Sequence, residues 1–227
     1  MNDRRELVDL LLFLGAFTAL SVAVMAAPVG LAGGWRLTAL VLVWWCALPA
    51  FALRRGHADW IAVWPFLAAT SVFQVLPDWF LAEGLGVLVF PDDGSPRIGA
   101  VSAYMAGLWT IPLFLTWWCA RAAAERRGEP AGTLVAGLVA LLIFGASEAF
   151  SRSLLGSWYA KDVTMWGDVA LYVLVPEALL GIATWTVAER TMTGSPGSKL
   201  AGGLAVAGFY TGCVALAWMF VERVSWS

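Results

Sequence analysis

Residues 73–112 read FQVLPDWFLAEGLGVLVFPDDGSPRIGAVSAYMAGLWTIP, and they form the only long break in a series of almost continuous apolar segments. The break lies between two segments apolar enough to cross a membrane, and it holds several charged residues: Asp78, Glu83, Asp92, Asp93 and Arg97. We therefore predict that residues 78–101 form an acidic loop outside the membrane, part of it an interfacial helix. We expect this loop to cover any site inside the bundle.

The composition is that of a membrane protein. Of the 227 residues, 60% are hydrophobic and 13% are charged, whereas a typical soluble domain carries roughly 25% charged residues. Apolar runs recur that reach the roughly 17 to 25 residues a helix needs to cross about 30 Å of hydrocarbon. Because the loops between them are short, we expect one membrane domain over residues 1–227. The formal net charge of −2 argues against a nucleic-acid partner.

The apolar runs predict an all-α, polytopic bundle of about seven transmembrane helices, because a helix satisfies every backbone polar group within its own segment. The expected spans are Leu7 to Ala27, Leu37 to Leu53, Trp60 to Pro77, Ser102 to Ala120, Thr133 to Ser151, Asp168 to Ala188 and Leu200 to Val221.

The distribution of basic residues predicts the orientation. With seven spans, nine Lys and Arg residues fall on the side of the N-terminus and five on the opposite side. Loops rich in Lys and Arg stay in the cytoplasm. We therefore expect a cytoplasmic N-terminus, an external C-terminus and an acidic loop outside, in a cell membrane.

Two predicted spans carry polar residues near their outer ends. In the third span, Gln74 and Asp78 are four residues apart and share one helical face, and Pro77 is expected to bend or end the helix beside them. In the fifth span, Glu148 and Arg152 have the same spacing and are expected to pair. The alternative interpretation is a polar helix end in one case and an interfacial ion pair in the other.

Glu177 lies deeper, in the sequence DVALYVLVPEALLG of the sixth span. A helix that enters the membrane near Asp168 places Glu177 about nine residues, or roughly 13 Å, below the surface. No basic residue lies within one turn. An unpaired carboxyl group there is expected to stay protonated and to act as a proton donor. Together, these polar residues predict a cavity beneath the acidic loop.

Known motifs exclude several classes of protein. The only lysines, Lys161 and Lys199, lie outside the predicted spans, so no retinal Schiff base is expected. SEAFSR resembles part of an intramembrane protease motif, but the sole histidine, His57, lies in a short loop. No cofactor or metal motif occurs. Asp92 and Asp93 are interpreted as turn residues in PDDGSPRIG.

One stretch of about 30 residues resembles a known family. Glu83-Gly84-Leu85-Gly86, then Phe90-Pro91, then Ile98 to Trp109 are similar to a stretch of the carotenoid hydratase family of bacteria and archaea. Ser102 stands where that pattern has proline. The resemblance implies a membrane enzyme that acts on an isoprenoid.

These observations lead to three functional hypotheses. The first is an enzyme of isoprenoid or carotenoid lipids, a hydratase or cyclase in which Glu177 or Glu83 protonates an alkene and Asp78 acts as the base. Glu148 and Arg152 complete its candidate catalytic residues, and its candidate substrate-binding residues are Gln74, Trp79, Tyr104, Trp109 and Tyr172. The second is a small proton-coupled or solute transporter with Glu177 at the midplane. The third is a membrane scaffold subunit. The partners expected are the lipid bilayer and a hydrophobic isoprenoid ligand, while the oligomeric state stays open.

Overall fold

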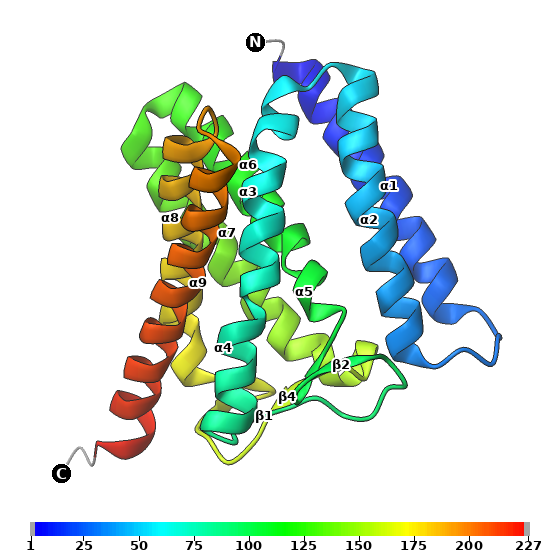
Figure 1. Ribbon diagram of the computed structural model, residues 1–227, viewed down its shortest axis with the longest axis vertical. Coiled ribbons are helices and arrows are strands. Elements are labelled where there is room, and N and C mark those ends of the chain that lie inside the picture. Colours follow the sequence, from blue (N-terminus) through cyan, green and yellow to red (C-terminus); the bar gives the residue numbers. More distant parts are fainter. Residues whose placement is uncertain (1–2, 225–227) are drawn as a thin grey trace.

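The computed structural model describes residues 3–224, and helices dominate it (Figure 1). The α-helices are α1 (Asp3–Ala26), α2 (Gly33–Arg55), α3 (Ala58–Phe73), α4 (Val75–Trp79), α5 (Met105–Leu108), α6 (Thr110–Arg127), α7 (Glu129–Phe150), α8 (Leu171–Thr191) and α9 (Pro196–Trp218). Three π-helical turns, η1 (Phe80–Gly84), η2 (Ser151–Leu155) and η3 (Met219–Arg223), extend α4, α7 and α9. This confirms the predicted all-α bundle.

Six helical segments of residues 3–224 are long and apolar enough to cross a membrane: Arg4–Ala26, Gly33–Arg55, Ala58–Gly84, Glu129–Leu155, Leu171–Thr191 and Pro196–Arg223. The remaining predicted span corresponds to the short helix α5 followed by α6. Helix α6 has 18 residues, and its last two turns contain Arg121, Glu125, Arg126 and Arg127, so only its first part is apolar. It nevertheless contacts α3, α7 and α8 and belongs to the bundle.

Helices α3, α6, α7, α8 and α9 form the body of the bundle, and the hairpin of α1 and α2 packs along one side (Figure 1). The contact between α7 and α8 is close because it is made by small residues. A Cβ atom added to Gly181 would lie 2.4 Å from the carbonyl oxygen of Ala136. Large aromatic side chains, among them Trp44, Trp60 and Trp117, are buried inside the bundle.

Two loops close one end of the bundle, which we call the lid end. Residues 85–104 carry β1 (Leu88–Val89), β2 (Arg97–Ile98) and β3 (Val101–Ser102), and residues 156–170 carry β4 (Tyr159–Ala160), β5 (Met165–Trp166) and β6 (Val169–Ala170). Strand β1 pairs with β4 in antiparallel fashion and so joins the two loops, whereas β2–β3 and β5–β6 are hairpins. The lid therefore consists of two loops, and the sequence predicted only one of them.

The first residues of the predicted 78–101 loop are helical, because the helix of the third span continues to Gly84. The residues from 85 to 104 are mostly extended and carry the short strands β1, β2 and β3. Gly86 has a φ of 69°, a left-handed conformation that does not continue a helix. Asp92 and Asp93 accept hydrogen bonds from the backbone of Gly94 and Ser95, respectively, which confirms that they are turn residues.

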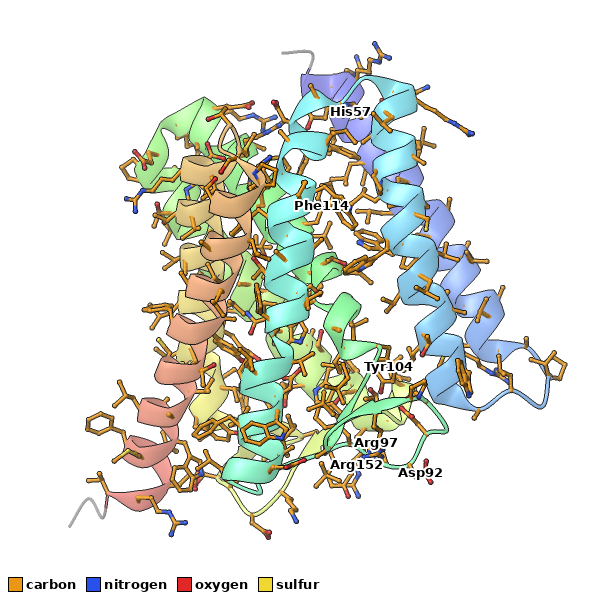
Figure 2. All side chains as sticks on the ribbon, viewed as in Figure 1. His57, Asp92, Arg97, Tyr104, Phe114 and Arg152 are labelled. Atoms are coloured by element: carbon orange, nitrogen blue, oxygen red, sulfur yellow. The ribbon has the colours of Figure 1, made fainter. Side chains whose placement is uncertain are left out.

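The opposite end of the bundle, which we call the N-terminal end, contains a buried ionic cluster that the sequence did not reveal. The Glu6 carboxylate accepts hydrogen bonds from Trp60 Nε1 at 2.8 Å and Trp118 Nε1 at 3.0 Å, and it pairs with Arg121. Arg121 also pairs with Asp59 at 2.8 Å. The cluster thereby joins α1 to α3 and α6. His57 lies at this end, and Arg97 and Arg152 lie at the lid end (Figure 2).

Candidate functional site

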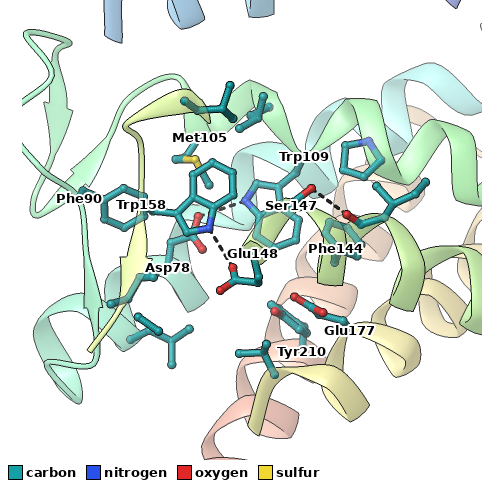
Figure 3. A pocket seen from close by; sticks show the side chains of 18 of the residues that line it. Asp78, Phe90, Met105, Trp109, Phe144, Ser147, Glu148, Trp158, Glu177 and Tyr210 are labelled. Carbon is teal, nitrogen blue, oxygen red and sulfur yellow. Dashed lines mark hydrogen bonds between the residues drawn. The ribbon is translucent and has the colours of Figure 1, made fainter. Parts of the chain in front are cut away.

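A cavity of about 190 Å³ lies beneath the lid (Figure 3). Helices α4 to α9 and both lid loops contribute to its wall. Most of its lining is apolar or aromatic, but three carboxyl groups face it: Asp78, Glu148 and Glu177. Within residues 3–224, no Lys, Arg or His side chain lines this cavity. The structure therefore brings three acids from three spans to one cavity whose described lining includes no basic residue.

Asp78 is held by the discontinuous helix of the third span. Helix α3 stops at Phe73, and α4 begins at Val75, so the irregularity falls at Gln74. The helix does not end at Pro77, as one part of the prediction had it, but continues to Gly84. The irregularity at Gln74 lies one turn before Pro77, which has no backbone N–H to donate to the carbonyl of Phe73. Asp78 is 4% exposed, and its Oδ2 accepts a hydrogen bond from Trp109 Nε1 at 3.1 Å.

Glu148 lies where α7 meets the lid. Its Oε1 accepts a hydrogen bond of 2.9 Å from Nε1 of Trp158, a residue of the second lid loop. Glu148 also borders a second, polar groove of about 270 Å³ on the lid, together with Arg152, Lys161 and Asp168. Glu148 is thus the only carboxyl group that lines both the cavity and the described polar groove.

The predicted ion pair between Glu148 and Arg152 is wrong. In the described chain, no salt bridge joins them; the guanidinium of Arg152 instead lies 4.6 Å from the ring centre of Tyr159. The physical reason is the π-helical turn η2, which begins at Ser151 and changes the rotation per residue between the two side chains.

Glu177 lies in the packed interior on α8, only 3% exposed. Its Oε2 has no hydrogen-bond partner among the described residues. The carboxyl groups of Asp78 and Glu148 each have an indole donor, whereas this one has none at that oxygen. Glu177 is therefore the least compensated acid of the cavity.

Aromatic rings surround the three acids. The ring of Trp109 lies 5.0 Å from that of Phe144 and 5.9 Å from that of Tyr210, measured between centroids. Tyr172, which the sequence predicted, also lines the cavity. Sequence reasoning missed Phe144, Tyr210 and several other lining residues: Phe90, Met105 and Trp158. Tyr210 could have been proposed as a site residue from the sequence, because it is the only tyrosine in the last predicted span.

Several predicted site residues lie outside the cavity. Glu83 is exposed, and its Oε1 accepts a hydrogen bond from the backbone N–H of Ala100 at 2.9 Å. Trp79 is 45% exposed. Gln74 is fully buried but does not line the cavity. Arg152 borders only the polar groove.

Tyr104, another predicted site residue, stabilises the lid. Its hydroxyl donates to Asp93 Oδ2 at 2.9 Å and shares a hydrogen bond with Ser157 Oγ at 2.5 Å, which ties the first loop to the second. Burial alone would raise the pKa of Asp93. Hydrogen bonds from Ser95 and Tyr104, together with the charge of Arg97, outweigh it and hold the pKa below its usual range.

The residues that the structure describes contain no group of three or more His, Cys, Asp or Glu side chains arranged to hold a metal ion. The fold and the cavity define a polytopic α-helical membrane protein with an acidic, aromatic cavity under a lid. Residues 75–221, more than half of the chain, match the family described as a domain of unknown function, DUF6989. The chain therefore belongs to this family.

The matched stretch contains every residue that lines the cavity, whereas α1, α2 and α3 lie outside it. The cavity is therefore built entirely from the part of the chain that defines the family. No curated protein and no solved structure matches the chain.

Proposed function

We propose that the protein is a membrane enzyme that protonates an alkene of an isoprenoid lipid and so promotes its hydration or cyclisation. One observation carries this proposal: Asp78, Glu148 and Glu177 share an apolar, aromatic cavity that no basic residue among residues 3–224 lines. Such a site suits a reaction that begins with proton donation and passes through a carbocation.

Glu177 is the proposed acid. A buried carboxyl group without a partner favours its neutral form, and only that form can donate a proton. Protonation forms a C–H bond from the alkene's π electrons and leaves a carbocation on the other carbon. The faces of Trp109, Tyr172 and Tyr210 are suited to stabilise this positive charge, as aromatic rings stabilise cations generally.

The second step needs a nucleophile and a base. Glu148 borders both the cavity and the polar groove, and this position favours it as the point where water reaches the cation. Attack by water forms the C–O bond, and the surplus proton passes to the carboxylate of Asp78 or Glu148. Its return to Glu177 closes the cycle. In a cyclisation, a second double bond of the substrate attacks the cation in place of water.

The size of the cavity limits the substrate. A dry, apolar cavity of about 150 Å³ accepts benzene, so 190 Å³ suits one or two isoprene units better than a whole carotenoid. The wall includes the half-buried apolar residues Leu108, Ile111 and Ile143, at the contact between the α5–α6 segment and α7. We propose that the reacting end of a longer lipid enters there, while the rest stays in the bilayer.

The test combines lipid analysis with a matched pair of variants. Lipids that co-purify with the protein are identified by mass spectrometry, and turnover is measured with an isoprenoid found among them. Glu177→Gln should abolish product formation without loss of folded protein. The control Glu129→Gln changes an exposed carboxyl group at the start of α7 and should leave turnover intact. Normal turnover by Glu177→Gln would refute the role of this acid.

We also propose that the N-terminus is cytoplasmic and that the lid lies outside the cell membrane, since nine of the 14 basic residues belong to the N-terminal side. Cysteines introduced at Asp168 in the lid and at Thr193 in the opposite loop distinguish the orientations. A thiol reagent that cannot cross the membrane should label the first in intact cells. Labelling of the second alone would reverse the assignment.

A second candidate function is a proton-coupled carrier. Three acids and several aromatic rings without a basic neighbour in the described cavity also suit a lipophilic organic cation, which would bind as protons leave. Flux measurements in liposomes separate the two proposals. The carrier should move an organic cation against a proton gradient, whereas the enzyme should change a lipid without net transport.

A further inference from the structure

Below the cavity, toward the N-terminal end, four polar residues lie fully buried. We call Ser71, Gln74, Thr116 and Thr184 the polar seam. Each of them is 0% exposed. In the chain from residue 3 to residue 224, the three hydroxyl groups and both amide atoms of Gln74 have no hydrogen-bond partner.

The spacing places these residues beneath the cavity acids. Ser71 precedes Asp78 by seven residues, and Thr184 follows Glu177 by seven. Seven residues are about two helical turns, or about 10.5 Å, and return to the same helical face. The helical path persists between α3 and α4, because the Asp78 N–H donates to Gln74 O at 3.3 Å.

Helix α6 supplies the third side of the seam. Thr116 follows Trp109, the hydrogen-bond donor of Asp78, by seven residues. Helices α3, α6 and α8 contact one another in all three pairings. The three hydroxyl groups therefore lie about two helical turns below the cavity, on the helical faces that carry Asp78, Trp109 and Glu177.

Neighbouring hydroxyl groups show that this lack of partners is unusual. Thr70 and Thr110, on the same helices and equally buried, donate to the carbonyl oxygens of Phe66 at 2.8 Å and Gly107 at 2.7 Å. Most buried polar atoms in native proteins have a partner, often an internal water that makes about three hydrogen bonds. We therefore expect internal waters at the five unpartnered atoms of the polar seam.

A titratable group, Glu189, lies beyond the polar seam at the N-terminal end. Glu189 follows Thr184 on α8 by five residues, about 7.5 Å along the helix. Its Oε1 accepts a hydrogen bond from Trp117 Nε1 at 3.3 Å, and Trp117 is adjacent to Thr116. Arg121 lies 5.1 Å from the ring centre of Trp117. Glu189 is itself exposed, so it can exchange protons with solvent.

We propose that the polar seam binds internal waters and forms a proton path that links Glu177 to Glu189. Glu177 then exchanges its proton with the face of the membrane opposite the lid. Near Glu189 the buried side chains include the apolar residues Leu67 and Ala188, which cannot carry a proton. The part of the path between the polar seam and Glu189 therefore requires bridging waters. The path is independent of the proposed enzymatic function. Hydration of an alkene returns its proton to the enzyme, so that reaction does not require proton exchange with solution.

The experiment follows the protonated carboxyl group of Glu177 by infrared spectroscopy in proteoliposomes of uniform orientation. The band is assigned by its loss in Glu177→Gln. An alkaline step on the N-terminal side should remove the band. The variants Thr184→Val and Ser71→Ala should slow this loss at least tenfold. The matched controls Thr110→Val and Thr70→Val, which remove partnered hydroxyl groups, should not slow it.

Three results would overturn the proposal. They are loss of the band only after a step on the lid side, no loss after a step on either side, and equal slowing by the seam and control variants. Thermal unfolding gives a second readout that does not require the band. A water bound at Thr184 predicts that Thr184→Val lowers the melting temperature. A rise would show that the hydroxyl is dry and would reject the path.

Discussion

Replacement of Glu177 by leucine should stabilise the protein while it abolishes any chemistry of the cavity. The Glu177 side chain is 3% exposed, and its Oε2 has no partner within residues 3–224. A buried polar atom without a partner costs about 1–3 kcal/mol. Leucine has a similar size, so the surrounding side chains need little rearrangement. The expected gain in the free energy of unfolding is therefore about 1–3 kcal/mol.

This gain is large enough to measure. For a protein of this size, each kcal/mol shifts the melting temperature by roughly 2–4 °C, so Glu177→Leu should unfold roughly 2–12 °C higher than the unmodified protein. Thermal unfolding in detergent, followed by tryptophan fluorescence, measures the shift. Glu129→Leu on α7 serves as the control, because that side chain is exposed. Destabilisation by Glu177→Leu of more than about 1 kcal/mol would show that the carboxyl group has a stabilising partner, and the reasoning would fail.

Three further changes test the site, the lid and the packing. Trp109→Phe removes the indole donor of Asp78 and should destabilise the protein by about 1–3 kcal/mol in thermal unfolding, an effect that Asp78→Asn should not add to. The pKa of Asp93 is lowered in the folded protein, so its charged form stabilises the lid at neutral pH. This stabilisation is lost as the pH falls from roughly 3.9, the unfolded value, through the lower folded value. Proteolysis of the lid should accelerate in that pH range. Gly181→Ala places a Cβ 2.4 Å from a backbone carbonyl oxygen and should destabilise the protein by about 1–3 kcal/mol. The control Gly208→Ala, whose Cβ would have nothing within 4 Å, should not destabilise it. Equal melting temperatures of the two variants would contradict the close contact at Gly181.

Hydropathy and helical spacing predicted the bundle and part of the cavity. Apolar length alone indicates the spans, because only helices satisfy the backbone within a membrane. Glu177 could be recognised as a candidate because it interrupts such a span, and Asp78 because it directly follows one on the face of Gln74. The spacing could not show that they meet, since that depends on how the third and sixth spans pack. The π-helical turn η2, which begins between Glu148 and Arg152, also leaves no mark on a regular helical pattern.

The lid was the least predictable part. Leu88 pairs with Ala160 across more than 70 residues, and short strands of two residues have no periodicity to detect. Trp158 therefore could not be assigned to Glu148 from the sequence. For the same reason, the sequence could not show that Glu83 lies outside the cavity, where its carboxyl group accepts a hydrogen bond from the backbone of Ala100.

The buried acids at the two ends of the bundle differ in whether hydrogen bonds and opposite charges compensate their burial. At the N-terminal end, the carboxylate of Glu6 has two indole donors and a guanidinium, so its burial is compensated. At the lid end, Glu177 keeps an oxygen without a partner in the described chain. Leucine there would lower the free energy of the folded state, so stability alone does not account for glutamate at this position. An acid that opposes folding is more readily explained by the chemistry of the cavity, and this contrast is the strongest physical argument for a reactive or proton-exchanging role of Glu177.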